Sequence, residues 1–143
     1  MGANRRLCVR NRQRAVPVDG RALRQQALWV LQHQLEWPTY DIGIELVSAR
    51  RMAQLNQAHL NHKGPTDILT FGYDASKRHG DLCICPWVAQ TQAGRFGTTT
   101  AQELARYLIH GLLHLAGYDD RHPRSRRRMK QVENRWLREL RAR

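Results

Sequence analysis

Four short apolar segments of the chain predict β-strands. Residues 42–47 alternate apolar and other side chains, which is the period-two pattern of a half-buried strand. Residues 7–9, 68–71 and 82–85 are short, mostly apolar runs, and such runs bounded by polar or glycine-containing segments are typical of strands. The polar segment 72–80 separates the last two runs and is compatible with a hairpin, so we expect these two strands to pair.

Apolar residues three or four positions apart predict the helices. Asp19 is placed to cap a helix over residues 20–36, and Ser48 is placed to cap a second helix. A short helix is expected over residues 87–93, and a longer one over residues 100–117. A final helix carries an apolar stripe formed by Met129, Val132, Trp136 and Leu140.

The order of these elements indicates the fold class. Strands and helices alternate early in the chain and helices dominate its end, which favours an α+β fold. We expect a small mixed four-stranded sheet packed with about five helices. The chain has 143 residues, which suits one hydrophobic core, so residues 1–143 are expected to form a single domain.

The helix predicted over residues 100–117 has recognisable ends and an apolar surface. Thr100 and Glu103 fit a capping box, in which a hydroxyl and a carboxylate satisfy amides at the helix start. Gly117 would end the helix, because glycine tolerates the left-handed conformation. The helix is apolar nearly all round and is therefore expected in the core; its apolar residues include Leu104, Leu108, Ile109, Leu112, Leu113 and Leu115.

A candidate metal site lies at the end of this helix. His110 and His114 are four residues apart, so both rings lie on one helical face and can bind one ion. The turn at Gly117 would bring Asp119 or Asp120 back as a third ligand. Two histidines and a carboxylate suit zinc, and also iron, manganese or nickel.

A competing interpretation is that both histidines are satisfied by ordinary hydrogen bonds in a buried helix. Burial of two imidazoles and a carboxylate costs several kcal/mol unless they find partners, and this favours a cation. The residue after His110 is Gly111, where metalloproteases of the HExxH class have a glutamate that acts as general base. A zinc peptidase is therefore disfavoured.

The charge of the chain favours a polyanionic partner. It contains 24 lysines and arginines against 12 acidic residues, which gives a formal net charge of +12. Four arginines lie close together near the start of the last predicted helix, where cations oppose the helix dipole and an external anion would stabilise them. These candidate phosphate-binding residues are Arg124, Arg126, Arg127 and Arg128.

Cysteine use and the N-terminal segment indicate the cellular compartment. Cys8, Cys83 and Cys85 form no CxxC pair and are odd in number, so neither a disulfide framework nor a cysteine zinc site is indicated. Residues 1–6 lack the apolar stretch of a signal peptide, and no segment has the apolar length of a membrane span. We therefore expect a cytoplasmic protein without a membrane partner.

Three separate motifs resemble those of the bacterial YbeY family of endoribonucleases. They are HGLLHLAGYD from His110, GPTDILTF over residues 64–71 and GDLCI over residues 80–84, in matching order and spacing over roughly residues 46–136. The resemblance implies a single-strand-type, metal-dependent endoribonuclease with one zinc ion per chain. It further implies a part in ribosome biogenesis through small-subunit rRNA 3′ end maturation, and in ribosome quality control, with RNA and the ribosome or its small subunit as partners.

The resemblance also implies a ligand set. The family pattern of three histidines, HxxxHxxxxxH, falls on His110, His114 and Asp120, so an aspartate stands at the third position. A carboxylate can ligate zinc, although its negative charge makes the ion a weaker Lewis acid than three imidazoles would. His122 is a rival third ligand, and Asp120 is favoured because it holds the family position.

A second departure from the family lies before Pro65. Family members usually carry an arginine five residues before this proline, and here the position is Leu60. His59, His62 or Lys63 could supply the positive charge, and Lys63 is included among the expected substrate-binding residues.

Thr66 and Asp67 match the family motif and would lie near the metal, or else serve only as a turn and a strand start. No catalytic side chain is assigned. Leu60 and Asp120 also keep open a different function, that of an RNA-binding or ribosome-binding maturation factor whose metal is mainly structural and whose nuclease activity is weak or absent.

Overall fold

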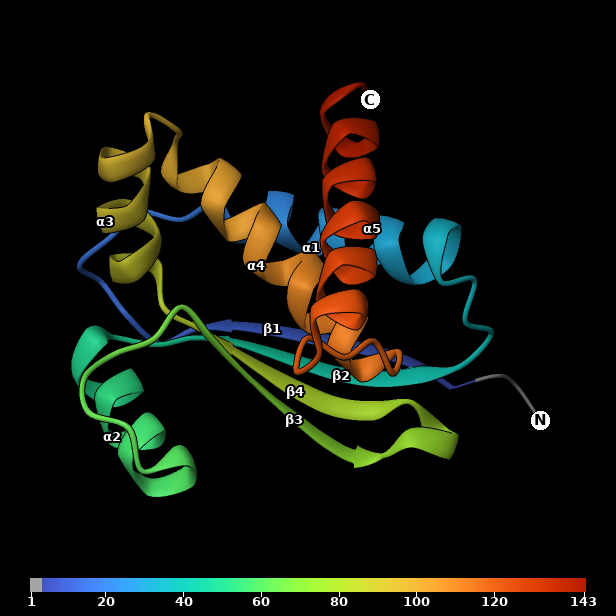
Figure 1. Cartoon of the computed structure of the whole chain (residues 1–143), viewed down its shortest axis with the longest axis horizontal. Helices are drawn as coiled ribbons and strands as arrows, with labels where there is room; N and C mark the ends of the chain where they lie inside the picture. Colours follow the sequence, from blue (N-terminus) through green and yellow to red (C-terminus); the bar gives the residue numbers. More distant parts are fainter. Residues whose placement is uncertain (1–3) are drawn as a thin grey trace.

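A mixed four-stranded sheet is the central layer of the structure, a computed structural model that describes residues 4–143 (Figure 1). The strand order is β1–β2–β4–β3, with β1, β2 and β4 parallel and β3 antiparallel to β4. The strands are β1 (Arg5–Asn11), β2 (Tyr40–Leu46), β3 (Ile68–Asp74) and β4 (His79–Ile84). All four predicted strands and the hairpin between the last two are confirmed. Residues 1–3, part of the N-terminal segment considered above, lie outside the described residues.

Five α-helices accompany this sheet, which confirms the α+β fold with a small mixed sheet (Figure 1). They are α1 (Gly20–Trp29), α2 (Ala49–Leu60), α3 (Pro86–Phe96), α4 (Thr100–Leu115) and α5 (Pro123–Arg141). Helices α1 and α4 contact the strands, whereas α3 and α5 pack mainly on α4. Helices α1, α4 and α5 lie on one side of the sheet, and α2 lies on the other (Figure 1). None of the helices within residues 4–143 is long and apolar enough to pass through a bilayer.

The sheet separates two apolar clusters of unequal size. The larger cluster lies between the sheet and helices α1, α4 and α5, and includes Ile44, Leu82 and Leu112, which are fully buried. The smaller cluster lies under α2 and includes Met52 and Leu69. Because successive side chains of a strand point to opposite faces, β3 contributes to both clusters.

The first predicted helix differs in detail from the structure. The helix expected over residues 20–36 has α geometry only to Trp29 and continues as a π-helix over Val30–Gln34. It ends before Glu36, whose positive φ of 53° breaks the helix. Its cap is confirmed, since the Asp19 carboxylate accepts from the amide of Ala22.

The predicted capping box of α4 was wrong by one residue. Thr99, not Thr100, is the N-cap; its hydroxyl accepts from the Gln102 amide at 3.1 Å, and Gln102 Oε1 accepts from the Thr99 amide at 3.0 Å. Glu103 is instead buried and accepts from the hydroxyl of Thr98 at 3.0 Å. In the sequence TTAQE, either Thr99 or Thr100 could begin a capping box. The hydrogen bond of Glu103 to Thr98 agrees only with Thr99 as the N-cap.

The other end of α4 positions the candidate site. The helix stops at Leu115, and Gly117 adopts a φ of +98°, as expected for a residue that reverses the chain after a helix. The chain therefore returns along the end of α4 before α5 begins at Pro123.

Candidate metal centre

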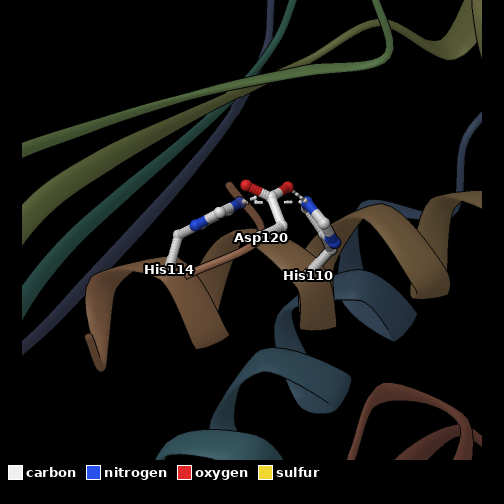
Figure 2. Close-up of side chains that lie close together, drawn as sticks. All are labelled: His110, His114 and Asp120. Carbon is white, nitrogen blue, oxygen red and sulfur yellow. Dashed lines mark hydrogen bonds and ion pairs between the residues drawn. The ribbon is translucent and has the colours of Figure 1, made fainter. Parts of the chain in front are cut away.

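Three potential ligand atoms converge at the C-terminal end of α4. The Nε2 atoms of His110 and His114 are 3.1 Å apart. Asp120, which follows the turn at Gly117, places Oδ2 3.4 Å from Nε2 of His114 and 3.7 Å from Nε2 of His110. Figure 2 shows both rings projecting from α4 with the carboxylate of Asp120 between them. This is the group expected from the sequence.

The spacing of these atoms fits a tetrahedral metal site. Zinc binds histidine nitrogen at about 2.0–2.1 Å, so neighbouring ligand atoms of a regular tetrahedron are about 3.3 Å apart. The three measured separations, 3.1, 3.4 and 3.7 Å, lie around this value. Three protein ligands leave one position open, as in catalytic zinc sites.

The hydrogen bonds of the two rings make both Nε2 atoms acceptors. His114 Nδ1 lies 3.2 Å from the backbone oxygen of Tyr118, and because a carbonyl only accepts, Nδ1 must carry the proton. His110 Nδ1 lies 3.0 Å from a carboxylate oxygen of Glu133 and donates to it. In the neutral rings, the two Nε2 lone pairs and Asp120 Oδ2 therefore face one another without a hydrogen, an arrangement that a cation stabilises.

Glu133 of α5 hydrogen-bonds to the candidate ligand His110, and the sequence analysis did not identify it as a candidate site residue. Its side chain is only 3% exposed, and it also accepts from Arg106 Nη1 at 3.1 Å and Lys130 Nζ at 3.0 Å. Its hydrogen bond raises the pKa of His110 above the usual value, in spite of burial. Burial alone would raise the pKa of Glu133, but the hydrogen bonds from His110 and Lys130 outweigh it and lower that pKa. Glu133 is therefore ionised and buried.

A signal for Glu133 is present in the sequence. It lies four residues after Met129 and three before Trp136, so it falls within the apolar stripe that was assigned to the last helix. A carboxylate on a buried helical face needs partners, and this could have marked it as a site residue.

Replacement of Glu133 by glutamine is expected to weaken metal binding about 10–100-fold, the range typical for groups that hydrogen-bond to metal-ligating histidines. The neutral amide retains the shape of the side chain but lowers the basicity of His110 and holds its ring less firmly. Competition with a chromophoric chelator measures the affinity. Glu139→Gln, which changes an exposed acid of the same helix, is the matched control and should leave the affinity unchanged. Equal affinities of the two variants would contradict the orienting role of Glu133.

The other candidate ligands lie outside this group. The Asp119 carboxylate accepts from the backbone amide of Arg121 at 2.8 Å and from its Nε at 3.1 Å. His122 is exposed and is the N-cap residue of α5. Among the described residues, Asp120 is thus the carboxylate that lies with the histidine pair.

A first depression, of about 630 Å³, approaches the three ligands from β3. It is lined by Leu60, where the family usually has an arginine, and by His59 and Asp67, whereas His62 and Lys63 lie outside its lining. The Asp67 carboxylate also accepts from the amide of Ile68 at 2.7 Å, so it begins the strand as well as lining the depression.

A second depression, of about 580 Å³, approaches the same ligands from α5. His110 and Asp120 line both depressions, so the candidate metal site lies where the two depressions meet. Of the four predicted phosphate-binding arginines, Arg126 and Arg127 line this second depression, together with Lys130. We call it the basic depression, although Asp120 and Glu133 also line it. The other two arginines, Arg124 and Arg128, are exposed but lie outside its lining.

The position after His110 faces the sheet and not the metal. A Cβ atom on Gly111 would lie 2.6 Å from Ile68 Cδ1 and 2.8 Å from Leu82 Cδ2, so glycine permits the close approach of α4 to β3 and β4. A glutamate here could not act on a ligand of the ion. The geometry thus supports the exclusion of an HExxH peptidase.

Comparison with known proteins gives the family. The family model described as Endoribonuclease YbeY matches residues 8–141. The chain belongs to the YbeY family. The resemblance found in its motifs is thereby confirmed.

Curated YbeY relatives match over most of the chain. The Endoribonuclease YbeY of Thermobifida fusca is 34% identical over 85% of this chain and 86% of its own length. That of Chlorobium luteolum is 39% identical over 70% of this chain and 74% of its own length. That of Bifidobacterium longum subsp. infantis is 34% identical over 78% of this chain and 67% of its own length. The solution structure of TM1509 from Thermotoga maritima shares the fold, with a TM-score of 0.69, 24% identity and coverage of 94% of this chain and 88% of that one.

Proposed function

We propose that this protein is a zinc-dependent endoribonuclease of single-strand type that processes ribosomal RNA. The observation that carries the proposal is the convergence of His110, His114 and Asp120 at the meeting point of two depressions, one of them basic, in a chain of the YbeY family. Its role is the maturation of the small-subunit rRNA 3′ end and ribosome quality control, with the ribosome or its small subunit as partner. The free cysteines Cys8, Cys83 and Cys85 support a reducing cytoplasm as its location.

In this proposal the ligands and the basic residues have separate tasks. His110, His114 and Asp120 hold one zinc ion, or another divalent ion, while Glu133 and the Tyr118 carbonyl keep both rings in the ligating tautomer. The ion would supply Lewis acidity toward a phosphodiester and a lowered pKa for a coordinated water. Candidate phosphate-binding residues beside the ligands are Arg126, Arg127 and Lys130.

Cleavage of ribosomal RNA with and without chelator tests the function. The full chain is incubated with small-subunit rRNA precursors, and the cleavage positions are mapped by primer extension. We expect cleavage to stop when a chelator removes the metal and to resume when zinc is restored. Cleavage that persists after complete chelation would refute the proposal.

A second candidate is an RNA-binding maturation factor with a mainly structural metal. Two observations favour it: Leu60, 51% exposed, lines the depression where the family usually has an arginine, and Asp120 replaces the third histidine of the family pattern. Metal removal would then lower the unfolding temperature, and the protein would bind RNA tightly without turnover. Robust metal-dependent cleavage would exclude this candidate.

Removal of the two arginines that line the basic depression is expected to weaken RNA binding and its salt dependence. Each phosphate contact contributes about 0.7 to the slope of log K against log salt for single strands, so Arg126→Gln with Arg127→Gln should lower the slope by about 1.4. Fluorescence anisotropy of a labelled single-stranded RNA at several salt concentrations measures this. Arg124→Gln with Arg128→Gln is the matched control of equal charge. Equal losses in the two double variants would show that the whole face of α5, and not the depression, binds the RNA.

A further inference from the structure

The depression beside β3 combines a metal-ligating end with an apolar region that the proposed chemistry does not use. It extends from His110 and His114 of α4, and Asp120 of the loop that follows α4, to residues at the C-terminal end of α2. There His59 and Leu60 are both exposed, and Leu60 has more than half of its surface open to solvent.

An aromatic contact shapes this apolar region. The rings of His59 and Phe71 meet edge to face with centroids 5.1 Å apart, and Phe71 is only partly buried. Leu60 lines the same depression beside them. A planar ring placed here would find an aromatic and aliphatic surface of the kind on which nucleic-acid bases stack.

The free edge of β3 supplies unpaired backbone groups to the same depression. Strand β3 is the last in the sheet order, so it has β4 on one side only. The Asp67 carbonyl accepts from the amide of Cys85, and hydrogen-bonded positions alternate in an antiparallel pair. Leu69 and Phe71 therefore bond to β4, whereas Thr70 directs its N–H and C=O to the free edge. A donor and an acceptor side by side match the hydrogen-bonding edge of a base.

We propose that this depression is a subsite for one unpaired base of the RNA, held on His59, Leu60 and Phe71 and read at the free edge of β3. The inference rests on the proposed function, because the base belongs to a nucleotide next to the phosphate at the metal centre.

Two features favour RNA over a peptide strand as the occupant of this edge. The depression shares the candidate ligands His110 and Asp120 with the basic depression of α5, so an occupant that reaches from one to the other meets Arg126, Arg127 and Lys130, to which phosphates would bind. The net charge of +12 also favours a polyanion. The two depressions then hold the strand on opposite sides of the cleaved bond, one through phosphates and the other through a base.

Abasic substrates test the subsite. A short unstructured RNA labelled with fluorescein is cleaved, and the cleaved bond is mapped. Two further RNAs, each with a single abasic ribose on one side or the other of that bond, are then compared with the intact RNA by their kcat/KM. We expect an abasic ribose on one side of the cleaved bond to lower kcat/KM about tenfold, the loss of one stacked base, and on the other side to have little effect. Equal kcat/KM for all the RNAs would overturn the subsite while leaving the endoribonuclease function intact.

A double variant connects this effect to the proposed residues. His59→Ala with Leu60→Ala changes two exposed side chains at the end of α2, so the fold should persist, as urea unfolding will check. It should lower kcat/KM about tenfold for the intact RNA, leave the abasic RNA unaffected, and leave the zinc affinity unchanged. Gln54→Ala, an exposed residue of α2 outside the depression, is the control. If the double variant shows the same difference in kcat/KM between intact and abasic RNA as the wild type, the base binds elsewhere. The same result is expected if the free edge of β3 binds a peptide.

The same comparison remains decisive if no RNA is cut, which would refute the proposed function. The dissociation constants of the intact and abasic RNAs are then measured by anisotropy with both forms of the protein. A base subsite predicts the same tenfold difference in Kd, lost in the double variant. Its absence would overturn the subsite independently of catalysis.

Discussion

Replacement of His114 by alanine is expected to abolish stable zinc binding and, with it, RNA cleavage. The variant loses one of three ligand atoms, and it leaves the Tyr118 carbonyl without its donor. Groups that merely hydrogen-bond to a ligand are worth about 10–100-fold in metal affinity, so loss of the ligand itself should exceed about 100-fold. The zinc content of the purified protein and competition with a chelator measure the effect.

The third ligand is tested by a matched pair of variants. Asp120→Ala should behave like His114→Ala, because Asp120 Oδ2 lies 3.4 Å from the ring nitrogen of His114. His122→Ala is the control, since this residue is exposed at the start of α5, and it should retain zinc. The reverse result, zinc lost from His122→Ala and kept by Asp120→Ala, would show that metal binding rearranges the loop after Gly117.

Replacement of Gly111 by glutamate is expected to destabilise the protein strongly, although it creates the HExxH sequence of a zinc peptidase. The new side chain would start 2.6 Å from Ile68 Cδ1 and 2.8 Å from Leu82 Cδ2, between α4 and the sheet. A carboxyl group buried there has no partner and displaces packed apolar atoms, which together should cost more than about 3 kcal/mol. That is a large part of the 5–15 kcal/mol by which domains are usually stable.

Urea unfolding measures this loss, and Gly111→Ala is the control. A methyl group displaces only the ends of Ile68 and Leu82, and alanine favours a helix over glycine by about 1 kcal/mol, so its net cost should be much smaller. Wild-type stability of Gly111→Glu would show that α4 can shift away from the sheet. Peptidase activity is not expected in either variant, because position 111 faces away from the ligands.

Local patterns were sufficient to predict the fold. The alternation in β2 and the cap residues Asp19 and Ser48 mark their elements because period and capping depend on neighbouring residues only. The predictions were wrong where the sequence allowed two alternative local structures, or where tertiary contacts determine which structure forms. Thr99 and Thr100 both begin a capping box in the sequence, and the buried contact between Thr98 and Glu103 agrees with the first.

The grouping of the three candidate metal ligands was predictable for the same reason, but their hydrogen-bond partner Glu133 was not. His110, His114 and Asp120 lie within one helix and the turn that follows it, so helical spacing and one glycine place them. Glu133 is 23 residues from His110 along the chain, and only the packing of α5 against α4 brings the two together. The periodicity of a single segment cannot predict a contact between two helices such as this one.

Charge alone did not predict which of the four arginines lie beside the candidate metal ligands. The four residues look equivalent in the sequence, but a helix turns by about 100° per residue and separates them. Arg124 and Arg128 are four apart and share one face, while Arg126 and Arg127 line the depression beside the metal ligands.

Helix α5 carries both the glutamate that holds His110 and the arginines beside the ligands. RNA that shifts this helix by even a fraction of an ångström would therefore change the hydrogen bond between Glu133 and the His110 ring. Thermodynamic reciprocity then applies: by whatever factor RNA alters the zinc Kd, zinc must alter the RNA Kd equally. If the chain binds zinc and RNA as proposed, each is an effector of the other, and an affinity measured for one has meaning only at a stated concentration of the other.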